Sequence, residues 1–381
     1  MISVLLITHQ TSRTGAPFSI LLIFEEILKK NKNITLDVVT LSSEGDLLED
    51  FENLGRNFFF LEKYFNYKKT VYEHFLSIFK LRSYNSPLEI LTQEISRNKY
   101  DIIYANTIVS IPFACLLKNK TNAKIIAHIH ELEYAMNECL ANFKTYDKNI
   151  DQYIVPSILN KRLLEEKYTI DPNKIEICRE AAQSPKSFLK KNTDKTSFNV
   201  YMCGTANWRK GEDLFLILAN ETVIADNTIH FYWIGQQPQN IKEKNKVELD
   251  KLATKDNIHF IDETKEIYNY IAKMDCFVLT SREDPFPLAA IEAGMSGLPI
   301  ICFSEGNGIQ EVIKNKGCII DYLDLEGMKN AIIDLKNNRI KYEEVSKNNL
   351  ETFSKFDAIY ASKIVLNNIK EISRKNETLI K

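Results

Sequence analysis

Short apolar segments rich in β-branched residues alternate with longer amphipathic segments along nearly the whole chain. In the first half, the pattern predicts a helix at 17–30 and strands at 2–8, 34–41, 57–61, 101–106, 124–130 and 152–156. Continuous apolar strands joined by helices are typical of parallel sheets that are covered on both faces. Because parallel βαβ units cross over right-handed, this half is expected to form a doubly wound, Rossmann-like sheet.

The alternation stops at 181–196 and then starts again. This polar, lysine-rich segment contains a proline and is typical of a linker. Beyond it, the pattern predicts strands at 198–203, 230–235, 258–261, 276–280 and 299–303, and helices at 211–221, 265–274, 287–296 and 308–315. The last segment, KFDAIYASKIVLNNIKEISRK, predicts one long amphipathic helix.

These breaks predict two α/β domains in tandem, which suits a chain of 381 residues. We place an N-terminal domain at 1–185, a linker at 186–196, a C-terminal domain at 197–355 and a terminal helix at 356–381.

Composition excludes some classes of function. The chain has 49 basic and 51 acidic residues, so nothing in its net charge attracts nucleic acid. Its seven cysteines form no C-x-x-C pair and are expected to be buried thiols. Of the six histidines, only His128 and His130 lie close enough in sequence to suggest a metal cluster. The start MISVLLIT lacks the features of a signal peptide, and no apolar stretch would span a membrane, so a cytoplasmic location is expected.

Ligands of open α/β sheets bind at the carboxyl ends of the strands. After strand 276–280, Asp284 lies in a Pro-Phe-Pro turn and Glu292 lies on the following helix, on a face of Ala and Leu. A carboxylate there must be paired or bind a polar ligand, because an unpaired buried charge is costly. The alternative is a turn aspartate and a solvated glutamate.

Two further loops of the second half follow strands. The stretch GTANWRKGED (204–213) places Arg209 and Lys210 between a strand and a helix, which suits an anion, although a solvated basic turn has the same pattern. In FSEGNGIQEVI (303–313), two glycines precede a helix expected to start near Ile309, whose amides would suit a diphosphate.

The first half offers fewer candidates. Gly15 opens the loop before helix 17–30, and AHIHELE places His130 and Glu131 at a strand end. A satisfied core histidine is the alternative for His130, because His128 shares its strand face. Asn106 and Ser157 are interpreted as loop and helix-cap residues.

These phrases resemble the motifs of the retaining family 4 glycosyltransferases (glycosyltransferase group 1). SREDPFPLAAIEAGMSGLPI is similar to the family's Glu-x7-Glu phrase, with Asp284 at the first Glu, Pro285 at the usual Gly and Glu292 at the second Glu. The resemblance implies that Asp284 binds donor-sugar hydroxyls and that Glu292 binds the ribose. Lys210 matches the lysine of the family's G-R-x(4-5)-K-G stretch, while Thr205 replaces its arginine.

Weaker similarities extend the resemblance over roughly residues 1–355. Asn307 stands at the first Gly of the family's GG-x-x-E loop, Gly15 matches its glycine-rich loop, and His130 matches a histidine that contacts the donor sugar. The resulting candidate site has catalytic His130, Lys210 and Asp284, and donor-binding Gly15, Ala16, Arg209, Thr264, Phe286, Leu288, Glu292, Asn307, Gly308 and Ile309.

The resemblance implies a GT-B fold, in which the terminal helix crosses back to the first domain, and a nucleotide diphospho-sugar as donor. The acceptor would be a glycan or a lipid-linked glycan of surface polysaccharide synthesis. The chain has no D-x-D, so no catalytic metal is expected, nor any cofactor besides the donor. The alternatives are a GT-B epimerase or phosphorylase, and a nucleotide-sugar-binding module without catalysis. An NAD oxidoreductase is disfavoured because no G-x-G-x-x-G follows the first strand of either half.

Residues 58–84 interleave aromatic residues with Lys63, Lys68, Lys69, Lys80 and Arg82. Such a segment favours a peripheral contact with an anionic membrane on the inner face of the cell. A strand followed by an ordinary amphipathic helix is the alternative.

Overall fold

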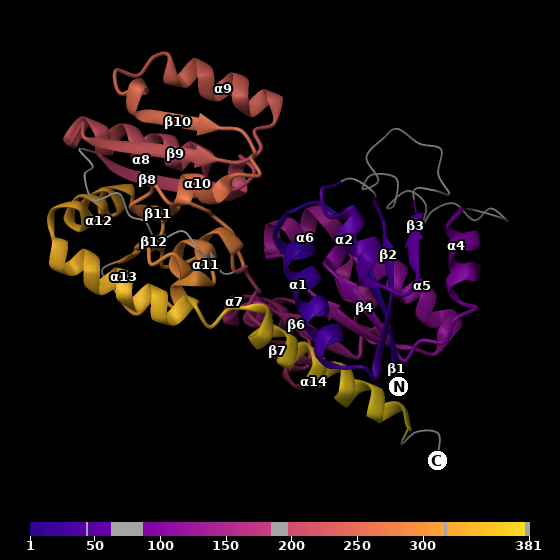
Figure 1. Ribbon diagram of the computed structural model, residues 1–381. Helices are drawn as coiled ribbons and strands as arrows, with labels where there is room; N and C mark the ends of the chain where they lie inside the picture. The colour runs from indigo at the N-terminus through magenta and orange to yellow at the C-terminus, as the bar shows by residue number, and fades with distance from the viewer. Residues whose placement is uncertain (43–44, 62–86, 184–196, 316–317, 378–381) are drawn as a thin grey trace. The chain divides into compact units, whose positions relative to one another are not determined.

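The computed structural model describes residues 1–42, 45–61, 87–183, 197–315 and 318–377 (Figure 1). The chain divides into two compact units. Unit 1 comprises Met1–Ala181 with Ala358–Lys381, and unit 2 comprises Ala182–Asp357. The predicted linker 186–196 and the basic aromatic segment from 62 onward lie outside the described residues.

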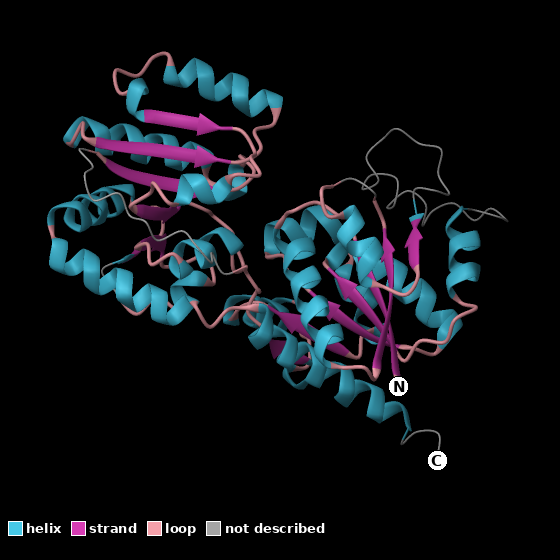
Figure 2. Cartoon of the chain, in the orientation of Figure 1, coloured by secondary structure: helices cyan, strands magenta, loops and turns pink. Residues whose placement is uncertain are grey.

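Unit 1 is built on a parallel sheet of seven strands in the order β3-β2-β1-β4-β5-β6-β7. The strands are β1 Ile2–Thr8, β2 Ile34–Thr40, β3 Phe58–Phe60, β4 Ile102–Asn106, β5 Lys124–His128, β6 Gln152–Val155 and β7 Ile175–Ile177. Its helices are α1 Gly15–Lys30, α2 Leu48–Leu54, α4 Pro87–Ile95, α5 Ile111–Thr121, α6 Glu133–Leu140, α7 Ile158–Arg162 and α14 Ala358–Glu377 (Figure 2). Unit 1 also contains the 3-10 helices η2 Ile108–Ser110, η3 Phe143–Asn149 and η5 Pro172–Lys174 and the π-helix η4 Leu163–Lys167.

Both faces of this sheet are covered. Val4, Leu5, Leu6 and Ile7 of the central strand β1 are all fully buried, although neighbouring side chains of a strand point to opposite faces. On one face, Leu5 and Ile7 join a core cluster that contains residues of α4 and α5. On the other, α14 packs along α1 and against β4 and β5.

Unit 2 is built on a parallel sheet of six strands in the order β10-β9-β8-β11-β12-β13. The strands are β8 Phe198–Cys203, β9 Ile229–Ile234, β10 Ile258–Ile261, β11 Cys276–Leu279, β12 Ile300–Phe303 and β13 Ile319–Ile320. Its helices are α8 Glu212–Ala225, α9 Gln239–Leu249, α10 Ile267–Ile271, α11 Leu288–Met295, α12 Leu325–Asn337 and α13 Arg339–Phe353. The 3-10 helices are η6 Trp208–Lys210, η7 Lys255–Asn257 and η8 Ile309–Glu311.

The two parallel, doubly wound sheets confirm the fold class expected from the sequence. Two expected helices are much shorter than predicted: 308–315 contains only the three-residue η8, and 265–274 contains only α10. The three-residue η8 has too few aligned peptides for a substantial helix dipole, so the helix start expected near Ile309 is not an anion site of that kind. All seven cysteines are free thiols, and five of them are buried. Within the described residues, no helix is both long and apolar enough to cross a membrane.

The contact between α11 and α13 depends on a glycine. A Cβ added at Gly294 would lie 2.3 Å from ring atoms of Phe353, a fully buried side chain. Gly294→Ala should therefore lower the free energy of unfolding by about 1–3 kcal/mol, because the packed ring must move. Urea denaturation followed by circular dichroism measures the change. Gly15→Ala is the matched control, since nothing lies within 4 Å of the added atom, and equal stability of the two variants would contradict this packing.

Candidate functional site

The loop after β8 fixes Lys210 over a glycine. Asn207 caps η6 by accepting a hydrogen bond from the Lys210 backbone N–H at 2.9 Å. The stem of Lys210 then lies 3.6 Å from the position that a Cβ of Gly204 would occupy. Gly211 ends the turn at φ +71°, where a Cβ would lie only 2.1 Å from the carbonyl oxygen of Thr280. Only glycine fits there, so the loop is held directly against the end of β11.

Lys210 and Asp284 form a buried ion pair. The Nζ of Lys210 donates to Oδ2 of Asp284 at 2.6 Å, and the two side chains are 15% and 5% exposed. The Ser281 hydroxyl donates to the same oxygen at 3.3 Å. Burial lowers the pKa of Lys210 below its usual range, and this effect exceeds the opposing influence of the Asp284 charge. The ammonium group is therefore poorly compensated, and a further anion would stabilise it.

The loop of Asp284 is joined by backbone hydrogen bonds to the loop after β12. The Asp284 N–H donates to the carbonyl of Gly306 at 2.7 Å, and the Gly308 N–H donates to the carbonyl of Asp284 at 3.2 Å. Asn307, fully buried between the two glycines, donates through Nδ2 to Phe303 and Glu305 carbonyls and accepts from the Gln310 N–H. Its side chain holds this loop closed, and the loops after β8, β11 and β12 thus meet at Lys210 and Asp284.

Glu292 lies on α11 and is half-buried. Its Oε1 accepts a hydrogen bond from the Tyr268 hydroxyl at 3.0 Å, so it is neither a solvated surface residue nor an unpaired charge. Arg209 donates to the carbonyl of Glu283 at 2.8 Å, which places its guanidinium beside the Asp284 loop. Thr264 caps the turn before α10 through its hydroxyl, which accepts from the Glu266 N–H.

Three further residues of the predicted donor site are apolar. Phe286 is buried and packs edge-on against Phe356, with ring centroids 5.4 Å apart. Ile309 is fully buried, and Leu288 begins α11 as a partly exposed residue. The side chains of Phe286 and Ile309 therefore belong to the core of unit 2.

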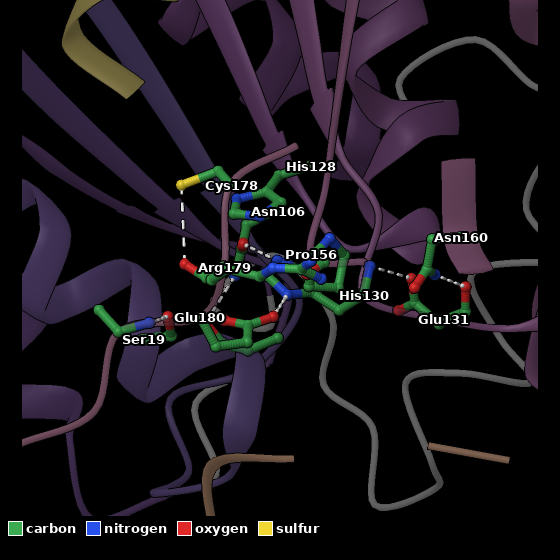
Figure 3. Close-up of polar contacts among 12 residues, drawn as sticks. Ser19, Asn106, His128, His130, Glu131, Pro156, Asn160, Cys178, Arg179 and Glu180 are labelled. Carbon is green, nitrogen blue, oxygen red and sulfur yellow. Dashed lines mark hydrogen bonds and ion pairs between the residues drawn. The ribbon is translucent and has the colours of Figure 1, made fainter. Parts of the chain in front are cut away.

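In unit 1, His130 follows β5 and both of its ring nitrogens have partners (Figure 3). Its Nδ1 lies 2.5 Å from Oε1 of Glu180, and its Nε2 lies 2.8 Å from Oδ1 of Asn106. The side chains of His130 and Glu180 are only 7% and 6% exposed. The Asn106 amide also donates to the carbonyl of Ala16 at 3.2 Å, which connects the cluster to the start of α1. Gly15 lies exposed at that helix start.

The surroundings shift the pKa values of His128 and His130 in opposite directions. Burial lowers the pKa of His130, but the charge and hydrogen bond of Glu180 outweigh burial, so the pKa is raised overall. Burial and the charge of His130 lower the pKa of His128 well below its usual value. The Nδ1 of His128 lies 2.9 Å from the Tyr104 hydroxyl. Of the two rings, His130 is therefore the one whose protonated form is favoured by its surroundings.

The structure brings the predicted residues together in two groups. Unit 2 gathers Lys210 and Asp284 with Arg209 and the Asn307 loop, and unit 1 gathers His130 with the start of α1. Glu180 was missed because it lies next to the polar segment taken as the linker, although it follows β7 as the other candidates follow their strands.

Comparison with known proteins identifies the fold and the family. Residues 197–338 match the family model described as glycosyl transferases group 1. Unit 2 belongs to this family. An uncharacterized glycosyltransferase of Haemophilus influenzae is 27% identical over 202 residues, which are 51% of this chain and 54% of that protein. The match thus spans about half the length of this relative.

The name of a second relative states its donor, its acceptor and the linkage that it forms. The UDP-Gal:α-D-GlcNAc-diphosphoundecaprenol α-1,3-galactosyltransferase of Escherichia coli is 26% identical over 182 residues, or 46% of each protein. Among solved structures, Anabaena Alr3699/HepE in complex with UDP-glucose aligns with a TM-score of 0.78 at 13% identity, covering 97% of this chain and 100% of the other. This likeness shows the fold, and it confirms the GT-B architecture expected from the sequence.

Proposed function

We propose that the group 1 domain is part of a retaining glycosyltransferase. It moves a sugar from a nucleotide diphospho-sugar to a glycan or lipid-linked glycan during surface polysaccharide synthesis. The observation that carries this proposal is the buried pair of Lys210 and Asp284 where three strand-end loops meet. The name of the E. coli relative supports a lipid-linked acceptor, and the UDP-glucose complex of the Anabaena protein supports a nucleotide-sugar donor.

Lys210 is assigned to the leaving diphosphate. Its ammonium group is held by a capped turn and packs over Gly204, so it needs no reorganisation when negative charge develops on the leaving group. The Asp284 carboxylate alone does not offset its burial, and a diphosphate would add the missing negative charge. Arg209, which is held by the Glu283 carbonyl, is the second cation of this loop.

The two carboxylates are assigned to hydroxyl groups of the donor. Both described contacts of Asp284 use Oδ2, so Oδ1 is the oxygen that we assign to a sugar hydroxyl. Glu292, whose Oε1 accepts a hydrogen bond from Tyr268, is assigned to the ribose hydroxyls. Because Asp284 is tied to Lys210, it is a poor covalent nucleophile. Retention is implied by the resemblance to family 4, and without a covalent intermediate it would proceed by displacement on a single face of the sugar.

His130 is assigned to the transfer step rather than to nucleotide binding. Its Nδ1 is held by a charged partner, Glu180, whereas its Nε2 contacts the neutral amide of Asn106. A hydrogen bond to a neutral amide oxygen is weaker than one to a carboxylate. Nε2 is therefore the ring nitrogen that can exchange its partner for a sugar hydroxyl.

The overall proposal is tested by incubating the full chain with a panel of nucleotide sugars in the absence of an acceptor. One nucleotide sugar should raise the melting temperature and slowly release free sugar and nucleoside diphosphate. If none of the panel stabilises the chain and none is hydrolysed, the chain is not a nucleotide-sugar transferase. Stabilisation without hydrolysis by any preparation would identify a binding module instead.

Glu292→Gln should weaken the binding of the nucleoside diphosphate. Loss of a charge-assisted hydrogen bond costs about 1.5–3 kcal/mol, which is roughly a 10- to 150-fold rise in Kd. Isothermal titration calorimetry measures it. Glu344→Gln, at an exposed position of α13, is the matched control, and equal affinities of the two variants would exclude the ribose assignment.

Lys210→Ala should lower kcat by about 10²–10³-fold, because the charge that it neutralises develops as the diphosphate leaves. Lys210→Met keeps most of the stem over Gly204 and should lower kcat similarly, so lost packing cannot explain the effect. Lys251→Ala, which removes a lysine that is 63% exposed, is the control. Turnover of wild type should not depend on added Mg²⁺. Near-normal turnover of both Lys210 variants, or a strict need for Mg²⁺, would overturn this assignment.

His130→Ala should abolish measurable transfer while the affinity for the nucleoside diphosphate stays unchanged, because the nucleotide contacts are assigned to unit 2. Transfer is measured by the release of nucleoside diphosphate, and affinity by calorimetry. If transfer falls only in proportion to a lowered melting temperature, His130 is a structural residue of unit 1.

A further inference from the structure

Three side chains of unit 1 converge on one point. His128, His130 and Glu180 each offer a ligand atom, and these atoms lie within 4.8 Å of one another (Figure 3). The two histidines stand at the carboxyl end of β5, with ring centroids 4.0 Å apart. Glu180 comes from the segment after β7, so the chain brings it there from a distant part of the sequence.

The hydrogen bonds described above leave two buried atoms of this cluster without a partner. These atoms are Nε2 of His128 and Oε2 of Glu180, on residues that are 1% and 5% exposed. A buried polar atom without a partner is costly, and native structures contain few of them. The hydrogen bond between His130 and Glu180 uses Nδ1 and Oε1, so the Nε2 of His128 and the Oε2 of Glu180 remain without a partner. A cation shared by the three residues would satisfy both.

The remaining nitrogens have the partners that metal-binding histidines need. A histidine that binds a metal through one ring nitrogen usually donates the other N–H to an oxygen, which orients the ring. For His128, the Tyr104 hydroxyl lies 2.9 Å from Nδ1. For His130, the side-chain oxygen Oδ1 of Asn106 lies 2.8 Å from Nε2. Each ring is thus oriented by one nitrogen, while the Nε2 of His128 has no partner and the Nδ1 of His130 faces Glu180.

We propose that His128, His130 and Glu180 form a binding site for one divalent transition metal ion, with Zn²⁺ as the expected ion. The ligands would be Nε2 of His128, Nδ1 of His130 and the Glu180 carboxylate. Two imidazoles with one carboxylate suit Zn²⁺, whereas Mg²⁺ and Ca²⁺ prefer oxygen ligands. On binding, the metal takes the place of the proton between His130 and Glu180, and this proton is released to the solvent.

The site is distinct from the diphosphate chemistry assigned to unit 2, where no metal is invoked. It would fasten the segment after β7 to the end of β5 and fix the orientation of the His130 ring. Since the ligands are buried, the metal would remain bound through purification. The inference does not depend on the proposed transferase activity, because binding is measured without any donor or acceptor.

The experiment uses the full, tag-free chain. Metal content is first measured on protein as purified, and then Zn²⁺ is titrated calorimetrically into protein dialysed against a chelator. We expect one Zn²⁺ per chain and no binding of Mg²⁺. Co²⁺ should replace Zn²⁺ and give the visible absorption of a low-coordinate site. Tyr104→Phe, which removes only the hydroxyl beside His128, should weaken Zn²⁺ binding by about 10- to 100-fold.

Glu180→Gln and His128→Gln should remove stoichiometric binding. His259→Gln is the matched control, because His259 stacks on His230 in unit 2 and should not affect Zn²⁺ binding. Absence of stoichiometric Zn²⁺ binding by wild type would overturn the proposal and leave a hydrogen-bonded imidazolium–carboxylate pair. Binding that is unchanged in Glu180→Gln and Tyr104→Phe would place the ion elsewhere, which also overturns it. The wild-type and Tyr104→Phe measurements decide the question even if the ligand variants fail to fold.

Discussion

The arrangement of unit 2 depends on the contact between the Lys210 ammonium group and the Asp284 carboxylate. A buried ion pair often fails to recover the cost of removing its charges from water, so it persists only where the surrounding backbone holds both partners. Here two loops hold the charged side chains, and each loop is fixed by contacts of its own. Asn207 and Gly211 fix the lysine turn, and the bridge between Asp284 and Asn307 fixes the aspartate. The strands need only end at the same edge of the sheet for these loops to meet.

The sequence predicts much of this arrangement because the signals involved are local. The strands are continuous apolar runs. The loops that follow them carry charged residues and glycines that packing alone would not require there. Lys210 and Asp284 are 74 residues apart, but each is recognisable within its own strand-loop-helix unit. Parallel topology then places both units at the same sheet edge. The family match over residues 197–338 covers the same region in which these local signals are strongest.

Residues whose role depends on tertiary contacts were less predictable. Glu180 follows a strand of three residues, too short to stand out in the pattern, and its partner His130 is 50 residues away. Asn106 has the composition of an ordinary loop residue, and only the structure shows that it links His130 to α1. For Phe286, the motif does not show whether the residue would contribute its side chain or its backbone to a site. Its ring fills the core beside Phe356.

Unit 1 is assembled from both ends of the chain, since α14 packs along α1. The apolar stripe of α14, which includes Val365 and Ile369, is fully buried. During synthesis, α14 emerges only after the whole of unit 2, because it follows Asp357 directly. Unit 1 must therefore wait until unit 2 has been synthesised, and until then the face of its sheet that α14 covers is exposed to water. Such long-range closure is slow and exposes apolar surface to aggregation. Removal of the final helix would make that transient state permanent.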